Sequence, residues 1–132
     1  MKIESHLENL KESIREIDKA ITEGLSKKQR TLGFHTSAAA IDILEIILHK
    51  SNLIDPGFMI KHEWFNSKRK IEEKFNFDFS NKKEIIRLIT SIENMRNNFC
   101  YGKRQDEETL EKLIQDFNRL KNIFKESTEY EL

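Results

Sequence analysis

The chain has 132 residues, of which 37% are hydrophobic and 35% charged, with only four glycines and one proline. This length fits one domain that buries a core without disulfide or metal staples, and the scarcity of backbone breakers favours long helices over turn-rich β-structure. The 23 basic residues equal the 23 acidic ones, which excludes the overall positive field of a non-specific nucleic-acid binder, so any nucleic-acid site must be a local patch.

Cysteine and histidine usage predicts neither a disulfide nor a metal site. Cys100 is the single cysteine, and the four histidines form no HExxH or HxH pair. The N-terminal residues are charged and helix-patterned, unlike a signal peptide. No apolar run approaches the roughly 20 residues that cross a bilayer. We therefore expect a cytoplasmic protein with no metal, no cofactor and no membrane association.

The first two predicted elements form a helical pair. Apolar residues spaced by four and three predict an amphipathic helix that ends at Gly24; they are Ile3, Leu7, Leu10, Ile14, Ile17 and Ile21. Ser26 and Gln29 have the spacing of a capping box and predict the start of a second helix, roughly Lys27–Lys50. This helix is apolar around most of its circumference, which predicts a central, buried position.

The middle of the chain has a weaker pattern. Ile60, Trp64, Ile71 and Phe75 keep a helical spacing that is interrupted near residues 66–67. Five of the nine phenylalanines lie between residues 58 and 79, and we expect them to cover one end of the helical bundle.

Two further helices are predicted in the C-terminal half. One starts near Ser80 or Asn81, with Glu84 completing a capping box, and ends at Gly102. The next begins after the acidic residues at 106–108, where negative charge suits a helix N-terminus. The chain is therefore predicted to be a single domain over residues 1–132, all-α, an up-and-down bundle of four to five helices.

A polar cluster stands at the end of the fourth predicted helix. Arg96, Asn97 and Asn98 occupy its last turns, and Lys103 and Arg104 follow. Basic residues near a helix C-terminus are favourable in any protein, and polar residues commonly cap helix ends. The pattern alone therefore fits an ordinary helix terminus as well as an anion-binding site.

The helix GFHTSAAAIDILEIIL, followed by a helix that ends in RNNFCYG, resembles the HEPN family. Members of that family are helical bundles of four or five helices and are commonly dimeric. Many are metal-independent endoribonucleases, others bind RNA or nucleotides, and several pair with a small nucleotidyltransferase in toxin–antitoxin systems. The resemblance places Arg96 at the family's arginine, Asn97 at the polar residue after it, and Tyr101 at the family's histidine.

Tyrosine at this position changes the chemistry that the resemblance implies. Histidine transfers protons near neutral pH, whereas tyrosine, with an ordinary pKa of about 10, is a poor base. Arg96 can still hold a phosphate through two parallel hydrogen bonds. The resemblance thus implies a homodimer that binds RNA or a nucleotide phosphate. Arg96, Asn97, Lys103 and Arg104 would contact phosphate, and Tyr101 would stack on a base.

Two alternatives stay open. The chain could be a metal-independent endoribonuclease, the toxin of a pair with a small nucleotidyltransferase, in which Arg96 dominates, Tyr101 is a doubtful catalytic residue and another residue transfers the proton. It could also be a structural or protein-interaction bundle. Of the remaining reactive residues, His35 is expected to be a hydrogen-bonded core or interface histidine. Cys100 stands beside basic residues that could lower its pKa, but no histidine partner is near in sequence.

Overall fold

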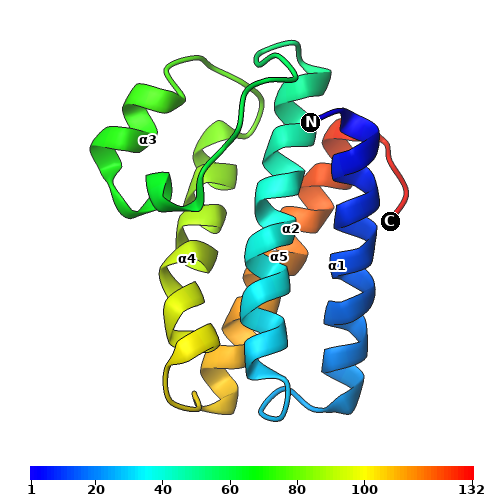
Figure 1. Ribbon diagram of the computed structural model, residues 1–132, viewed down its shortest axis with the longest axis vertical. Helices are drawn as coiled ribbons and strands as arrows, with labels where there is room; N and C mark the ends of the chain where they lie inside the picture. Colours follow the sequence, from blue (N-terminus) through cyan, green and yellow to red (C-terminus); the bar gives the residue numbers. More distant parts are fainter.

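The computed structural model describes all 132 residues, and every regular element is helical. Four long helices, α1 (Ile3–Glu23), α2 (Gln29–Lys50), α4 (Lys82–Tyr101) and α5 (Glu107–Thr128), run alternately down and up the bundle (Figure 1). A 3-10 turn, η1 (His62–Asn66), and the short helix α3 (Lys68–Lys74) stand between α2 and α4. The predicted all-α bundle of four to five helices is confirmed.

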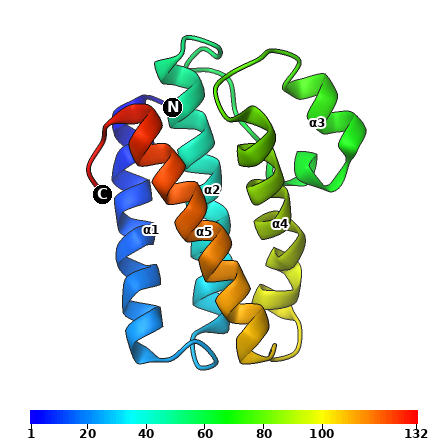
Figure 2. The same ribbon diagram turned by 180° about the vertical axis from the view of Figure 1, so that it is seen from behind.

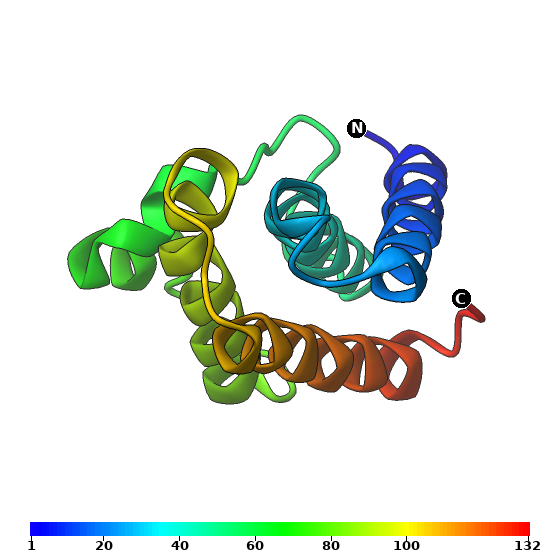
Figure 3. The ribbon, with the colours of Figure 1, turned by 90° about the horizontal axis from the view of Figure 1, so that it is seen from below.

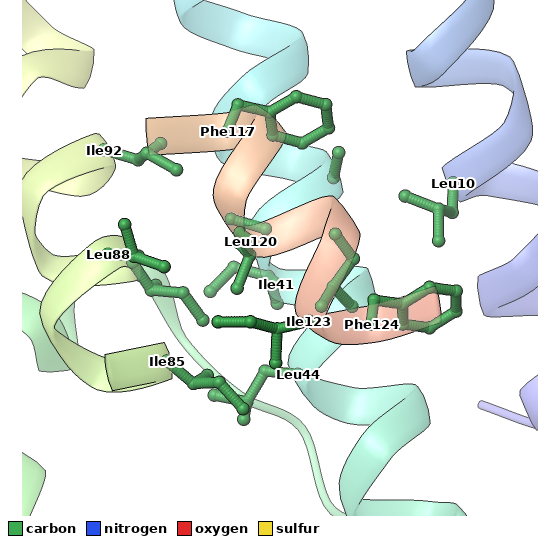
Figure 4. Close-up of a cluster of buried hydrophobic side chains, with 14 of the residues drawn as sticks. Leu10, Ile41, Leu44, Ile85, Leu88, Ile92, Phe117, Leu120, Ile123 and Phe124 are labelled. Atoms are coloured by element: carbon green, nitrogen blue, oxygen red, sulfur yellow. The ribbon is translucent and has the colours of Figure 1, made fainter. Parts of the chain in front are cut away.

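Helix α2 is the centre of the molecule, because it contacts α1, α4 and α5. Seen along the bundle in Figure 3, the other long helices surround it on several sides. Its buried apolar residues belong to one hydrophobic core, in which each fully buried Leu, Ile or Phe contributes about 1.5–3 kcal/mol. Figure 4 shows this core, where side chains from all four long helices converge; the labelled ones are Leu10, Ile41, Leu44, Ile85, Leu88, Ile92, Phe117, Leu120, Ile123 and Phe124.

The central position of α2 also explains its apolar composition. By length and composition α2 is the one helix that could cross a membrane, yet 78% of its most apolar stretch is buried inside the bundle. A core helix is apolar all round because it meets protein on every side. The burial therefore accounts for the composition without a bilayer.

The start of α2 differs from the prediction. Gly24 does end α1, with a φ of 120° and its N–H bonded to the carbonyl of Ala20, so that prediction is confirmed. The capping box is wrong, because α2 begins at Gln29 without a side-chain cap. Gln29 instead donates Nε2–H bonds to the carbonyls of Phe99 (3.3 Å) and Lys103 (3.0 Å). Its side chain joins the start of α2 to the end of α4.

The starts of the two C-terminal helices, α4 and α5, differ in how well they match the prediction. Asn81 has a left-handed conformation (φ 63°) and makes no capping bond, and Glu84 pairs with Arg87 instead, 3.0 Å away. The second predicted capping box is therefore also wrong. The acidic start of α5 is confirmed, because the Asp106 carboxylate accepts a 2.8 Å bond from the Thr109 amide.

The connector, residues 58–79, flanks α4 on the side away from α1 (Figures 1 and 2). Only its last part reaches the end of the bundle, where Phe79 lies with Ile47 of α2 and Thr128 of α5 around one depression. The predicted interruption is real, since Ser67 separates η1 from α3 and its hydroxyl caps α3. Aromatic rings hold the connector together: Trp64 and Phe75 lie with centroids 6.0 Å apart. Lys82 donates to the carbonyls of Phe75 and Phe77 and fixes the segment to the first turn of α4.

Candidate functional site

Arg96 lies on α4 and lines a cavity of about 650 Å³ between that helix and the connector. The α4 side of the cavity carries Glu93, Arg96 and Asn97, which are adjacent on a helix because they are three or four residues apart or next in sequence. The connector supplies the opposite wall, residues 59–63 and Asn66. The cavity thus exists only because the connector folds back along α4.

The guanidinium of Arg96 has no protein partner. Its Nε atom is buried and makes no hydrogen bond, and the side chain takes part in none of the ion pairs of the chain. A guanidinium carries five N–H donors, and a buried donor without a partner costs about 1–3 kcal/mol. The site therefore holds a half-buried positive charge that an anion in the cavity would satisfy.

A second group, Ser37, His62 and Glu93, lies beside this charge. The Glu93 carboxylate, buried between α2 and α4, accepts a 2.6 Å bond from the Ser37 hydroxyl. The same carboxylate lies 2.9 and 3.0 Å from His62 Nδ1. Because a carboxylate only accepts hydrogen bonds, Nδ1 is the donor in this contact, and in the neutral imidazole this leaves Nε2 as an acceptor. The His62 side chain is 40% exposed, so this nitrogen can reach a ligand.

Sequence reasoning missed His62 and Glu93. His62 stands far from Arg96 along the chain, in the region with the weakest periodicity, and nothing in its local sequence marks it. Glu93 did leave a signal, since it falls four residues after Ile89 on the apolar face of α4. A carboxylate on a buried face needs a hydrogen-bond partner, and the structure supplies Ser37 and His62.

Tyr101 occupies a different surface. It is 75% exposed and lines a separate depression of about 410 Å³ with Arg30, Phe34 and His35 among others. Tyr101 is five positions after Arg96 on the helix. This spacing places the two side chains roughly 140° apart around the helix axis. The structure therefore brings Asn97, but not Tyr101, into the cavity of Arg96.

Lys103 and Arg104 also lie outside that cavity. Both side chains are exposed beyond the end of α4. Arg104 donates a 3.1 Å bond to the carbonyl of Ser26, and the Lys103 carbonyl accepts from Gln29. The Arg104 side chain and the Lys103 backbone therefore contact the α1–α2 turn and the start of α2, and neither residue lies beside Arg96 in the same chain.

The surroundings of Cys100 and His35 indicate that both residues have structural roles. Burial raises the pKa of the Cys100 thiol, and the nearby charges of Arg96 and Arg30 only partly oppose this. The suggestion that basic neighbours lower this pKa is therefore wrong, and the thiol remains protonated at neutral pH. His35 Nδ1 lies 3.1 Å from the Ser13 hydroxyl across the α1–α2 contact, as expected for a hydrogen-bonded histidine.

No family model, curated protein or solved structure matches this chain. What the site can do therefore has to follow from its own residues.

Proposed function

We propose that this domain is a HEPN-like module that binds a phosphate group of RNA or of a nucleotide in the cavity around Arg96. The observation that carries the proposal is the half-buried guanidinium without a protein partner. Arginine is suited to phosphate because its planar fork makes two parallel, charge-assisted hydrogen bonds. An anion would supply the acceptors that the protein itself does not.

The surroundings of Arg96 support the same ligand. Glu93 forms no ion pair with Arg96, since its oxygens accept bonds from Ser37 and His62, although the charges of Glu93 and Glu63 also line this cavity. Asn97 and Lys61 add further donors to the cavity wall. A volume of about 650 Å³ lies within the roughly 300–1,000 Å³ of small-molecule sites. Because this turn is close to the negative end of the α4 dipole, the side chains, and not the helix end, must attract the anion.

A second candidate function is favoured by His62. Cleavage of RNA without a metal needs a group that takes a proton from a 2′-hydroxyl or delivers one to the leaving oxygen. His62 and Arg96 line one cavity, and Glu93 holds Nδ1 of His62, as an orienting carboxylate does in acid–base sites. Such catalysis typically contributes about 10²- to 10⁴-fold. In a metal-independent endoribonuclease, His62 would thus replace the histidine that the sequence lacks at Tyr101.

Partners and location follow from the proposal. We expect a cytoplasmic homodimer, in which the exposed Tyr101, Lys103 and Arg104 extend the RNA path beyond the cavity and Tyr101 stacks on a base. A small nucleotidyltransferase is the expected partner if the chain is the toxin of a toxin–antitoxin pair. A domain without affinity for RNA or nucleotides would instead be a structural or protein-interaction bundle.

The test measures binding of a fluorescent single-stranded RNA of mixed sequence by anisotropy, for wild type, Arg96→Ala and Arg96→Lys. Loss of a charge-assisted bidentate contact is worth about 1.5–3 kcal/mol, so we expect Arg96→Ala to weaken binding by about tenfold or more. Arg96→Lys keeps the charge without the fork and should fall between. Arg15→Ala, which removes an exposed cation from α1, is the matched control and should stay within about twofold. Equal affinity in wild type and Arg96→Ala would refute the proposed site.

Cleavage of the same RNA in EDTA separates the two candidate functions. Cleavage by wild type that disappears in His62→Gln, while binding persists, would establish the endoribonuclease. Silence in wild type with intact binding would support the binding module. Circular dichroism in the same buffer checks that the fold persists in EDTA.

A further inference from the structure

Four polar side chains gather inside the contact between α1 and α2, away from the Arg96 cavity. His6 comes from the first turns of α1, and Asp42, Glu45 and His49 come from the last turns of α2. The three α2 residues share one helix face, because their spacing is three and then four residues. His6 is 3% exposed and Glu45 is 4% exposed, so this is a buried cluster and not a solvated charge group.

The His6 ring is held between two carboxylates. Its Nδ1 lies 2.8 Å from Asp42 Oδ1 in a hydrogen bond. Its Nε2 lies 2.7 Å from Glu45 Oε2, yet this nitrogen makes no hydrogen bond. The carboxylate oxygen is within reach but away from the direction in which a ring N–H would point. His6 Nε2 and Glu45 Oε2 are therefore close without being hydrogen-bonded to each other. Both can act as ligands of a third atom that lies between them.

His49 repeats the same feature. Its Nε2 atom is buried and has no hydrogen-bond partner, and its ring centroid lies 5.9 Å from that of His6. Two buried ring nitrogens without partners in one cluster are unusual, since buried polar atoms are nearly always satisfied. A cation between the His6 ring and the Glu45 carboxylate would satisfy both groups, because His6, Asp42 and Glu45 offer ligand atoms within 4.8 Å of one another. His49 is outside that set and would have to turn its ring toward Glu45 to join it.

The neighbouring groups fix the orientation that metal binding needs. Glu45 Oε1 accepts a 2.9 Å bond from the Ile60 amide, which leaves Oε2 to face His6. Asp42 holds the other nitrogen of His6, the arrangement by which a carboxylate orients a metal-ligating histidine.

We propose that His6, Glu45 and His49 bind one divalent transition-metal ion, with Asp42 as the residue that positions the His6 ring. Two imidazoles and one carboxylate suit Zn²⁺ and related ions, whereas Mg²⁺ and Ca²⁺ prefer oxygen ligands alone. Zn–N and Zn–O bonds of about 2.0–2.2 Å place tetrahedral ligand atoms roughly 3.3 Å apart. His6 Nε2 and Glu45 Oε2 would therefore move apart by roughly half an ångström, which side-chain rotation permits.

The ion would have a structural role, which does not depend on the proposed phosphate site. It would join α1 to the end of α2 and, through the Glu45–Ile60 bond, to the connector that walls the Arg96 cavity. Binding should thus be visible as metal affinity and as thermal stabilisation, whether or not the domain binds RNA.

The experiment uses the full chain without an affinity tag, because a histidine tag binds the same ions. After EDTA treatment and desalting, the protein is titrated with Co²⁺, whose visible absorption reports ligand geometry, and with Zn²⁺ in competition with a chromophoric chelator. We expect one equivalent of Zn²⁺ and a rise in Tm on loading. His6→Gln, Glu45→Gln and His49→Gln should each weaken Zn²⁺ binding by at least about tenfold, and Asp42→Asn by about 10- to 100-fold.

His35→Gln is the matched control, since His35 also lies on α2 and hydrogen-bonds to α1 but is not in the cluster. It should bind Zn²⁺ as wild type does. Circular dichroism identifies any variant that fails to fold, and the wild-type titration needs no variant. The proposal is overturned if wild-type protein takes up no Zn²⁺ or Co²⁺, if affinity survives in both His6→Gln and His49→Gln, or if His35→Gln abolishes it.

Discussion

At the scale of single residues, two charged neighbours on α4 have opposite surroundings. Glu93 and Arg96 are three residues apart, yet the carboxylate is fully hydrogen-bonded while the guanidinium has no partner. A protein that used Arg96 only for stability would direct it to a carboxylate or into solvent. Its half-buried position against a cavity wall is instead what a ligand-binding arginine requires.

Gly33 permits the close contact between α2 and α4 next to this site. A Cβ at Gly33 would lie 2.5 Å from the Cβ of Phe99, so Gly33→Ala forces the two helices apart. Alanine in a helix would by itself stabilise by about 0.5–1 kcal/mol, but overpacking costs about 1–3 kcal/mol. We expect a net loss of about 1–2 kcal/mol in the free energy of unfolding, measured by urea denaturation.

Gly57→Ala is the control for Gly33→Ala. There an added Cβ would meet Asp55 Oδ1 at 3.5 Å, an ordinary contact, so stability should change by less than about 0.5 kcal/mol. If Gly33→Ala were as stable as wild type, the α2–α4 contact would be adaptable and the position of Phe99 and its neighbours would not be fixed by packing.

At the scale of elements, the first turn of α5 should give the chain a measurable acid sensitivity. Hydrogen bonds from the side chain and the amide of Thr109 lower the pKa of Asp106. A group with a lowered folded-state pKa stabilises the fold above its unfolded pKa, about 3.9, and this contribution is lost as the pH falls through the folded-state value. Asp106→Asn keeps a good cap but cannot titrate. The Tm advantage of wild type over Asp106→Asn should therefore shrink as the pH falls from neutral to about 3.

Asp18→Asn gives the comparison for this pH series, because Asp18 lies on the exposed face of α1 and its carboxylate caps nothing. Its difference from wild type should not follow the Asp106 trend. A Tm difference between wild type and Asp106→Asn that stays constant over the whole range would contradict the assigned role of the Asp106 charge.

The helices themselves were largely predictable, whereas the starts of α2 and α4 were not. The stripe from Ile3 to Ile21 and the apolar α2 determine what must be buried, so periodicity alone located them. The two capping boxes failed because Gln29 makes long-range bonds to α4 and Asn81 adopts a left-handed conformation. Local motifs describe a helix end in isolation, whereas the start of α2 is tied to α4 by tertiary contacts.

The site was predictable only in part, for the same reason. Arg96 and Asn97 could be selected because they are local to one helix end. His62 enters the cavity through the path of the connector, and His6 meets Glu45 through the packing of α1 on α2. Such long-range pairings leave no characteristic residue spacing that could be recognised in a single sequence.

At the scale of the whole molecule, the connector links the two polar clusters. Ile60 donates its amide to Glu45 of the buried cluster and also lines the cavity of Arg96. His62 lies two residues further along and reaches Glu93. The α1–α2 cluster and the cavity wall are therefore joined by the Glu45–Ile60 hydrogen bond and the backbone from Ile60 to His62.

The connector should also unfold together with the bundle. Trp64, the single tryptophan, is 6% exposed and belongs to the same buried core as the residues of the long helices. Its fluorescence therefore reports on the connector, whereas far-UV circular dichroism reports mainly on the long helices. Because one continuous core holds both, we expect the two urea transitions to coincide at a single midpoint, as in two-state unfolding.

Lys82→Met makes the test of this cooperativity more stringent. The substitution keeps the apolar stem but removes the bonds to Phe75 and Phe77, 2.6 and 2.7 Å long, that attach the connector to α4. If the core alone couples the two parts, both transitions should shift together to lower urea. A tryptophan transition that precedes the helical one, in wild type or only in Lys82→Met, would show that the cavity wall opens independently, and the Arg96 site would then be assembled and lost without unfolding of the bundle.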